Sequence, residues 1–143
     1  MSTAPFGPVV GYLPGVFDLF HVGHLNALQQ ARAQCDVLVA GVVSDEVCEQ
    51  VKGRRPVIPL EERVAIVDAI GIVDATYVER TPDKLDAWRQ VGFHKVFKGD
   101  DWRQTRKGLE LERRVASVGA EVVYFPYTVH VSSTLLRRAI AAS

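Results

Sequence analysis

The chain contains few cysteines, no long hydrophobic run and no excess of charge of either sign. Its two cysteines, Cys35 and Cys48, are too few for a disulfide framework or a four-thiolate zinc site. It has no stretch of about 18 uncharged apolar residues, so we expect no membrane-spanning helix. Residues 1–8 lack the charged start and apolar run of a signal peptide, and we therefore expect a cytoplasmic protein.

The charge balance argues against two classes of partner. Lys+Arg and Asp+Glu number 17 each, which gives a formal net charge of zero. Binding to nucleic acid or to an acidic membrane surface needs a basic excess or patch, so we expect neither partner. A chain of 143 residues with 48% hydrophobic and 24% charged residues has the composition of a single globular domain, which we predict over residues 1–143.

Apolar runs alternate with amphipathic segments along the chain. Residues 44–58 are polar without a long period, and we predict a short helical turn followed by a loop. Strands alternating with helices indicate a single Rossmann-like α/β domain, with a mostly parallel five-stranded sheet and helices on both faces. The expected strands are residues 9–13, 36–43, 76–78, 95–98 and 121–125, and the expected helices are residues 22–34, 59–70, 83–91, 105–118 and 132–142.

Polar and charged residues follow the ends of the expected strands. Such sheets bind ligands beyond the carboxyl ends of their strands, so these residues should meet at one edge. Arg63 lies one helical turn beyond Pro59, close to the same edge. The segments that follow the strand ends are Gly15 to His24, Lys52 to Arg55, Gly99 to Trp102, and Thr128 with Ser132 to Thr134.

This collection of residues suits a triphosphate. Two histidines three residues apart, His21 and His24, lie on one face of a helical turn and can reach the same phosphate group. Gly23 leaves room for that phosphate near the backbone. Helices that begin near His21 and Ser132 offer free N–H groups to an anion. Phosphoryl and nucleotidyl transfer depend on such positioned donors, so we predict a phosphate-handling site.

Each feature taken alone also has a structural explanation. A histidine pair at this spacing is often structural or solvated, a basic loop is often a solvated surface, and a run of hydroxyls often only caps a helix. A zinc site would lack its third and fourth ligands. We assign no functional role to His94 and His130. Trp88 is expected in the core, and Trp102 near a ligand.

Taken together, the residues resemble the cytidylyltransferase family of nucleotidyltransferases. Residues 15–24 match that family's G-x-F-D-x-x-H-x-G-H signature in full. The resemblance continues through residues 42–46, 59–63, 99–102 and 131–134. The length is similar to that of the bacterial glycerol-3-phosphate cytidylyltransferases, and residues 42–46 are also similar to the ethanolamine-phosphate cytidylyltransferases.

The resemblance implies a reaction and its participants. CMP would pass from CTP to a small phosphorylated alcohol such as glycerol 3-phosphate, giving a CDP-alcohol and pyrophosphate by in-line attack. Mg²⁺ is expected with CTP, held by phosphate oxygens and water, so we predict no metal-binding protein residue. A homodimer is typical of the family and is the expected assembly.

The resemblance also assigns roles to individual residues. The catalytic residues would be His21, His24, Lys52 and Arg63, and the acceptor-binding residues would be Asp18, Lys52 and Arg54. The implied nucleotide-binding residues are Gly15, Val16, Phe17, Gly23, Asp100, Trp102, Tyr127, Thr128, Ser132, Ser133 and Thr134.

Two departures from the family pattern leave the acceptor open. Residues 127–130 read Tyr-Thr-Val-His where the family has R-T-x-G, and Gly71 stands where bacterial glycerol-phosphate enzymes have an arginine. Phosphoethanolamine or a small phosphonate are therefore alternatives to glycerol 3-phosphate. Two other functions also remain as alternatives. One is an adenylyltransferase of the same superfamily, acting for example on a sugar phosphate or FMN, and the other is a nucleotide-binding protein without turnover.

Overall fold

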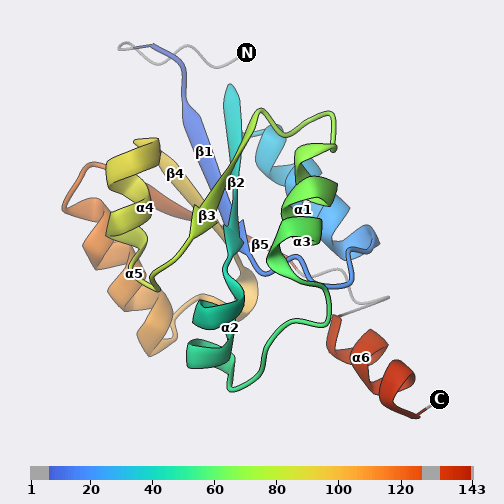
Figure 1. Ribbon diagram of the computed structural model, residues 1–143. Helices are drawn as coiled ribbons and strands as arrows, with labels where there is room; N and C mark the ends of the chain where they lie inside the picture. Colours follow the sequence, from blue (N-terminus) through green and yellow to red (C-terminus); the bar gives the residue numbers. More distant parts are fainter. Residues whose placement is uncertain (1–6, 127–132, 143) are drawn as a thin grey trace.

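Five parallel strands form one sheet in the order β3-β2-β1-β4-β5, with helices on both faces (Figure 1). The computed structural model describes residues 7–126 and 133–142. The strands are β1 (Val10–Gly15), β2 (Val37–Val43), β3 (Ala75–Glu79), β4 (Lys95–Gly99) and β5 (Glu121–Phe125). The helices are α1 (Val22–Arg32), α2 (Asp45–Lys52), α3 (Leu60–Asp68), α4 (Lys84–Val91), α5 (Arg106–Ala116) and α6 (Ser133–Ala142), and a 3-10 turn, η1 (Asp100–Trp102), follows β4. The predicted α/β fold is confirmed.

The structure differs from the sequence prediction in residues 44–58, where the sequence predicts only a short helical turn. Residues 45–52 form the eight-residue helix α2, and the predicted loop follows it over residues 53–58. Ser44 stabilises its start, because the Ser44 hydroxyl accepts a hydrogen bond from the N–H of Val47 at 3.1 Å. Asp45 and Glu46 in the first turn favour the positive end of the helix dipole. Gly53, at φ 77°, ends the helix in the left-handed conformation that glycine adopts without strain.

A second difference concerns the end of α3, which the sequence predicts at Gly71. The helix ends at Asp68, and Gly71 has no positive φ. The chain turns away after Ala69 so that Ile70, Ile72 and Val73 pack against the core. Burial of these apolar side chains therefore sets the end of α3, rather than a glycine cap.

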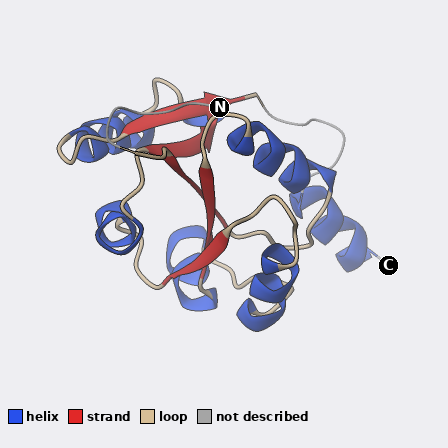
Figure 2. Ribbon diagram, turned by 90° about the horizontal axis from the view of Figure 1, so that it is seen from above, coloured by secondary structure: helices blue, strands red, loops and turns tan. Residues whose placement is uncertain are grey.

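The core consists of two apolar layers. They lie between the sheet and the helices that cover its two faces, which Figure 2 shows on either side of the strands. Successive side chains of a strand point to opposite faces, so Leu13 belongs to the layer under α1 and α3, and its neighbour Tyr12 to the layer under α4 and α5. Trp88 packs against the second layer, as predicted. Both layers hold the parallel strands in register, and all carboxyl ends meet at the lower edge in Figure 1.

A buried polar contact links three elements near that edge. Tyr12 reaches across β2 and donates its hydroxyl hydrogen to Glu79 at 2.5 Å. This crossing requires Gly41, because a Cβ atom there would overlap the Tyr12 hydroxyl oxygen. Glu79 also accepts a charged hydrogen bond from Lys84 at 2.7 Å. The Glu79 carboxylate is therefore occupied by two donors.

Candidate active site

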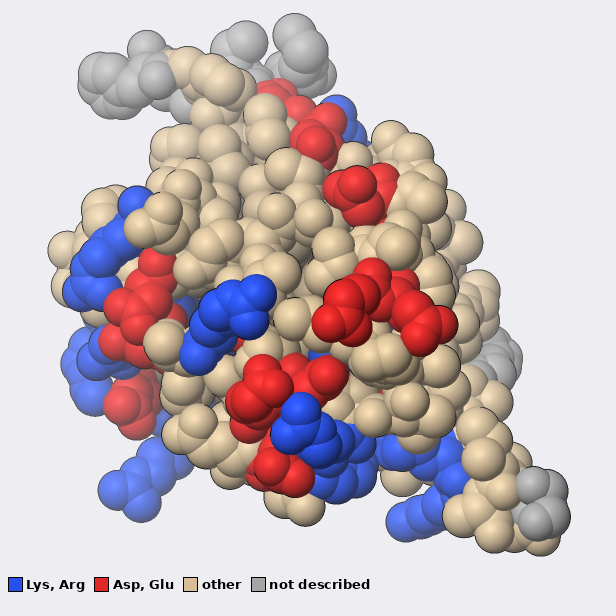
Figure 3. All heavy atoms as spheres, in the orientation of Figure 1, with Lys and Arg blue, Asp and Glu red and all other residues tan. Residues whose placement is uncertain are grey.

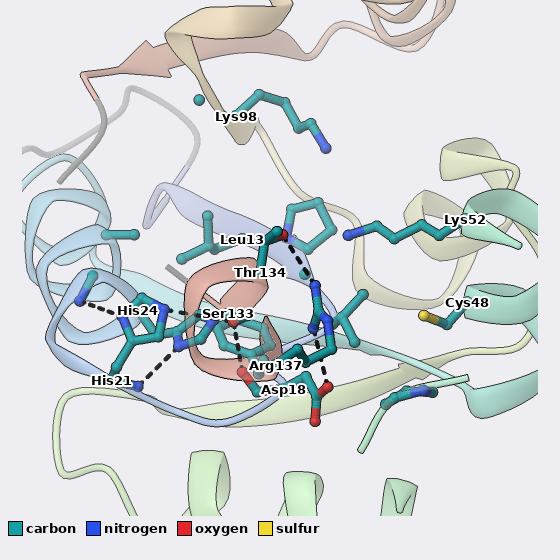
Figure 4. A pocket seen from close by; sticks show the side chains of 18 of the residues that line it. Leu13, Asp18, His21, His24, Cys48, Lys52, Lys98, Ser133, Thr134 and Arg137 are labelled. Atoms are coloured by element: carbon teal, nitrogen blue, oxygen red, sulfur yellow. Dashed lines mark hydrogen bonds and ion pairs between the residues drawn. The ribbon is translucent and has the colours of Figure 1, made fainter. Parts of the chain in front are cut away.

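A cleft of about 340 Å³ opens at the carboxyl edge of the sheet (Figure 4). The end of β1 and the signature loop line it, together with the start of α1, the end of α2 and its loop, the ends of β4 and β5, and the start of α6. Many of the residues that the sequence predicted for the site lie together here. They are Gly15, Val16, Phe17, Asp18, His21, Gly23, His24, Lys52, Arg54, Ser133 and Thr134.

The two histidines cap α1 and line the cleft at the same time. Nδ1 of His21 accepts the N–H of Gly23 at 3.0 Å, and Nδ1 of His24 accepts the N–H of His21 at 3.0 Å. Because each Nδ1 is an acceptor, each neutral ring carries its proton on Nε2. The ring centroids are 4.1 Å apart, and Nε2 of His21 lies 3.5 Å from the Ser133 hydroxyl. Both imidazoles thus keep an Nε2–H donor outside the helix cap, and that of His21 lies next to the Ser133 hydroxyl.

The surroundings keep both imidazoles neutral. Burial lowers the pKa of His24 to about 4, and repulsion from His21 adds to this effect. Burial also lowers the pKa of His21. Both rings are therefore neutral N–H donors at neutral pH before an anion enters the cleft.

Asp18 connects the signature loop to two other segments. Its carboxylate is 1% exposed and accepts the N–H groups of Val57 and Ile58, each at 2.9 Å. Arg137 of α6 donates to the same carboxylate at 3.2 Å, and the Ser133 hydroxyl donates to the Asp18 carbonyl at 2.7 Å. These contacts position the loops around the cleft. The acceptor-binding role of Asp18 stays a prediction.

Arg63 occupies a different position from the one expected. Its guanidinium is buried and donates to the carbonyls of Ile58, Val16 and Val43 at 2.7–2.8 Å. It also forms an ion pair with Asp45 at 2.6 Å. The structure places Arg63 behind the cleft wall: the residue is buried and does not line the cleft, and four of its five guanidinium N–H groups are bound to three carbonyls and a carboxylate.

The nucleotide-binding roles of Asp100 and Trp102 stay predictions, and the structure places both residues outside the lining of the cleft. They lie outside it because η1 turns the chain away after Gly99. Asp100 is exposed and pairs with Arg103 at 3.3 Å, while Trp102 packs against the core layer under α4 and α5. The predicted residues Tyr127, Thr128 and Ser132 lie outside the described residues.

The cleft carries more cationic side chains than the sequence analysis assigned. Arg55 pairs with Glu46 at 3.1 Å, and Arg137 pairs with Asp18. Within residues 7–126 and 133–142, no carboxylate lies within ion-pair distance of the other three, Lys52, Arg54 and Lys98. Figure 3 shows basic and acidic side chains interspersed on the face drawn.

Sequence reasoning missed Lys98 and Arg137. A signal existed for Lys98, which directly follows the buried residues Val96 and Phe97 on the same strand. A lysine next to a buried run is uncommon unless it has a partner or a function. Arg137 lies one helical turn after Ser133, on the same face of α6. Both side chains reach the cleft only because the ends of β4 and α6 come together at the edge of the sheet.

Two further properties of the described residues bear on ligands. Within that part of the chain, no group of three or more His, Cys, Asp or Glu side chains is placed to hold a metal ion. No helix among the same residues has the length and apolar character needed to cross a membrane.

The fold and the cleft define an α/β nucleotidyltransferase. Residues 12–139 match the family model described as Cytidylyltransferase-like, and the chain belongs to that family. The FAD synthase of Thermococcus onnurineus (strain NA1) is 37% identical over 115 residues, which cover 79% of this chain and 76% of that protein.

Other relatives match over a smaller share of their own length. The bifunctional protein HldE of Hyphomonas neptunium (strain ATCC 15444) is 33% identical over 91% of this chain, but the match spans 26% of HldE. The ethanolamine-phosphate cytidylyltransferase of Arabidopsis thaliana is 55% identical over 67 residues, which are 47% of this chain and 16% of that enzyme.

Solved structures support the fold. A lipopolysaccharide core biosynthesis protein from Thermoplasma volcanium GSS1 superposes with a TM-score of 0.72 at 23% identity, covering 85% of this chain and 98% of that one. Pantothenate synthetase from Thermus thermophilus gives a TM-score of 0.67 at 19% identity, covering 90% and 61%. At these identities the likeness concerns the arrangement of strands and helices alone.

Proposed function

We propose that the protein transfers AMP from ATP to the phosphate of a small acceptor and releases pyrophosphate. The observation that carries this proposal is the cleft itself, with paired imidazole donors in one part and unpaired lysines in another. The adenylyl group is favoured by the FAD synthases, which resemble this chain over most of both lengths, since FAD is FMN joined to AMP. The relatives described above name FAD and ethanolamine phosphate, so they favour the alternatives over glycerol 3-phosphate.

In this mechanism the imidazoles hold the triphosphate. An oxygen of the acceptor phosphate attacks the α-phosphorus and forms a new P–O bond. The bond from the α-phosphorus to the oxygen that bridges the β-phosphate breaks, and pyrophosphate leaves with that electron pair. The attacking phosphate is already ionised, so no base needs to remove a proton. The Nε2–H donors of His21 and His24 stabilise the charge that develops on the phosphate oxygens.

The cleft suits a metal ion that arrives with the nucleotide. Asp18 is the carboxylate among the described lining residues, and it already accepts two N–H groups and Arg137. The remaining polar side chains are mostly cationic or imidazole donors, which bind phosphate rather than Mg²⁺. We therefore propose that triphosphate oxygens and water hold Mg²⁺, which neutralises part of the triphosphate charge.

A second candidate is transfer of CMP from CTP to ethanolamine phosphate. The 67-residue match at 55% identity favours it, and so does the segment Gly99-Asp100-Asp101-Trp102, which resembles the cytidylyltransferase pattern. Gly99 lines the cleft, so its backbone is available to a base.

A product assay separates these functions. The protein is incubated with Mg²⁺ and either ATP or CTP, together with FMN, sugar phosphates, ethanolamine phosphate, glycerol 3-phosphate or a phosphonate. Pyrophosphate release is followed, and the products are identified by mass. We expect an adenylylated acceptor. A cytidylylated product alone would support the second candidate, and tight nucleotide binding without any product would indicate a protein without turnover.

A further inference from the structure

Two lysines reach the same part of the cleft from different walls. Lys52 is the last residue of α2, and Lys98 is the penultimate residue of β4. Figure 4 shows both ammonium groups pointing into the space on the side away from His21 and His24. The cleft therefore has a histidine end and a lysine end, with the end of β1 between them.

The ammonium group of Lys98 is held without a counter-ion. It lies 3.8 Å from the centroid of the Trp102 ring, a cation–π contact that fixes its position. Glu79 contributes an attractive charge from the neighbouring region, but its carboxylate already binds Tyr12 and Lys84. No ion pair of Lys98 exists within residues 7–126 and 133–142.

Lys52 is more exposed to water than Lys98. Burial of part of its side chain lowers the pKa of its ammonium group, Arg54 and Arg137 add repulsion, and Cys48 and Asp18 oppose them. Lysines that only stabilise a fold pair with a carboxylate or extend into water, because an unpaired buried charge is costly. Lys98 is half-buried and unpaired among the described residues, and Lys52 points into the same space, so an anion that binds both ammonium groups explains their arrangement best.

We propose that Lys52 and Lys98 together bind the phosphate of the acceptor, which is a phosphate or phosphonate monoester rather than a carboxylate. The identity of this anion as the acceptor rests on the proposed function. In-line attack needs the acceptor on the side of the α-phosphorus opposite to the leaving pyrophosphate, and the lysine end lies away from the histidines. Two ammonium charges match a phosphate dianion, whereas a carboxylate would neutralise one of them.

A binding experiment tests the site without turnover. Inorganic phosphate, methylphosphonate and acetate are titrated into the wild-type protein by calorimetry, and Trp102 reports through its fluorescence. We expect phosphate and methylphosphonate to bind at least tenfold more tightly than acetate. Binding of both should weaken at least tenfold in Lys98→Met and in Lys52→Met, and Lys98→Arg should recover part of it.

Lys95→Met is the matched control, because Lys95 lies on the same strand and donates to the Gln34 carbonyl outside the cleft. It should bind phosphate as the wild type does. Unchanged phosphate binding in Lys98→Met would overturn the inference, and so would binding lost only on removal of the histidines. Far-ultraviolet circular dichroism verifies that each variant is folded.

Kinetics distinguish failure of this inference from failure of the proposed function. In Lys98→Met we expect KM for the acceptor to rise at least tenfold, while KM for the nucleotide changes less than twofold. Turnover with an unchanged acceptor KM would overturn the lysine site and leave the function intact. Lysine-dependent phosphate binding without turnover on any nucleotide would overturn the function and leave the anion site intact.

Discussion

Each signature histidine combines a structural contact with a chemical one. His21 and His24 use Nδ1 to accept backbone N–H groups at the start of α1, which fixes the ring orientation and the tautomer. Burial lowers the pKa of both rings, and repulsion from His21 adds to this for His24, so both rings stay neutral at neutral pH. The Nε2–H donors are therefore set before a ligand arrives.

His21→Asn separates the two contacts. Asparagine caps helices well, so we expect His21→Asn to change the free energy of unfolding by less than about 0.5 kcal/mol. His21→Ala loses the cap, and this loss should cost about 1 kcal/mol. The Nε2–H donor disappears, and kcat/KM should fall by about 10²–10³. Denaturant unfolding and initial rates measure the two effects. Equal activity of His21→Asn and the wild type would contradict the assigned donor.

The lysine end of the cleft predicts a pH dependence. Burial, together with repulsion from Lys84 and Lys52 and opposed by attraction from Glu79 and Asp101, lowers the pKa of Lys98 to about 8. Lysine is charged below its pKa, so anion binding is strong below pH 8 and weakens as the pH rises through it. We expect kcat/KM for the acceptor to fall about tenfold per pH unit above about pH 8.

Lys98→Arg supplies the control for this profile, because a guanidinium keeps its charge throughout this range. The fall above pH 8 should be absent in that variant. A wild-type profile that stays flat to pH 10 would show that Lys98 does not govern acceptor binding.

At the scale of elements, the loops around the cleft are held by buried polar contacts from other segments. Arg63 of α3 donates to carbonyls at the ends of β1 and β2, and Asp18 accepts from the loop before α3 and from α6. These contacts fix the directions in which the chain leaves each strand. The walls of the cleft are thus positioned from behind by Arg63, which does not line the cleft, and from within by Asp18 and Arg137, which do.

Arg63→Met tests whether this arginine acts through the fold. Its loss leaves three carbonyls and Asp45 without their donor, which should cost about 3–5 kcal/mol. For a chain of this size Tm falls by roughly 2–4 °C for each kcal/mol, and thermal unfolding measures the shift. Arg54→Met, which alters an unpaired cleft cation, should leave Tm nearly unchanged. A normal Tm with reduced activity in Arg63→Met would instead indicate direct contact with the triphosphate.

At the scale of the whole molecule, the sheet lies between the two core layers and carries the cleft at its carboxyl edge. Tyr12 of β1 passes over β2 and binds Glu79 of β3, which Lys84 of α4 also binds. Lys84 offsets part of the Glu79 charge that reaches Lys98. The pairing of strands therefore decides the electrostatics of the cleft as well as its shape.

Gly41→Ala tests this crossing. The new Cβ would overlap the Tyr12 hydroxyl oxygen, so Tyr12 must move and its bond to Glu79 must break. We expect a loss of about 2 kcal/mol or more, measured by denaturant unfolding, because overpacking and a lost buried hydrogen bond act together. Gly71→Ala is the control, since nothing lies within 4 Å of its Cβ position, and it should be neutral or slightly stabilising. Equal stability of the two variants would contradict the packing described.

Local patterns in the sequence were enough for the order of strands and helices, the single α/β fold and the spacing of His21 and His24. These depend on hydrophobic periodicity and on neighbours within one helical turn, which short-range physics decides. The tertiary structure alone decided that Arg63 faces inward, that η1 carries Asp100 and Trp102 away, and that Lys98 enters the cleft. These positions depend on which face of the sheet a side chain occupies and on which carbonyls or rings from distant segments contact it there. The packing of the strands and helices fixes both the face and the contacts.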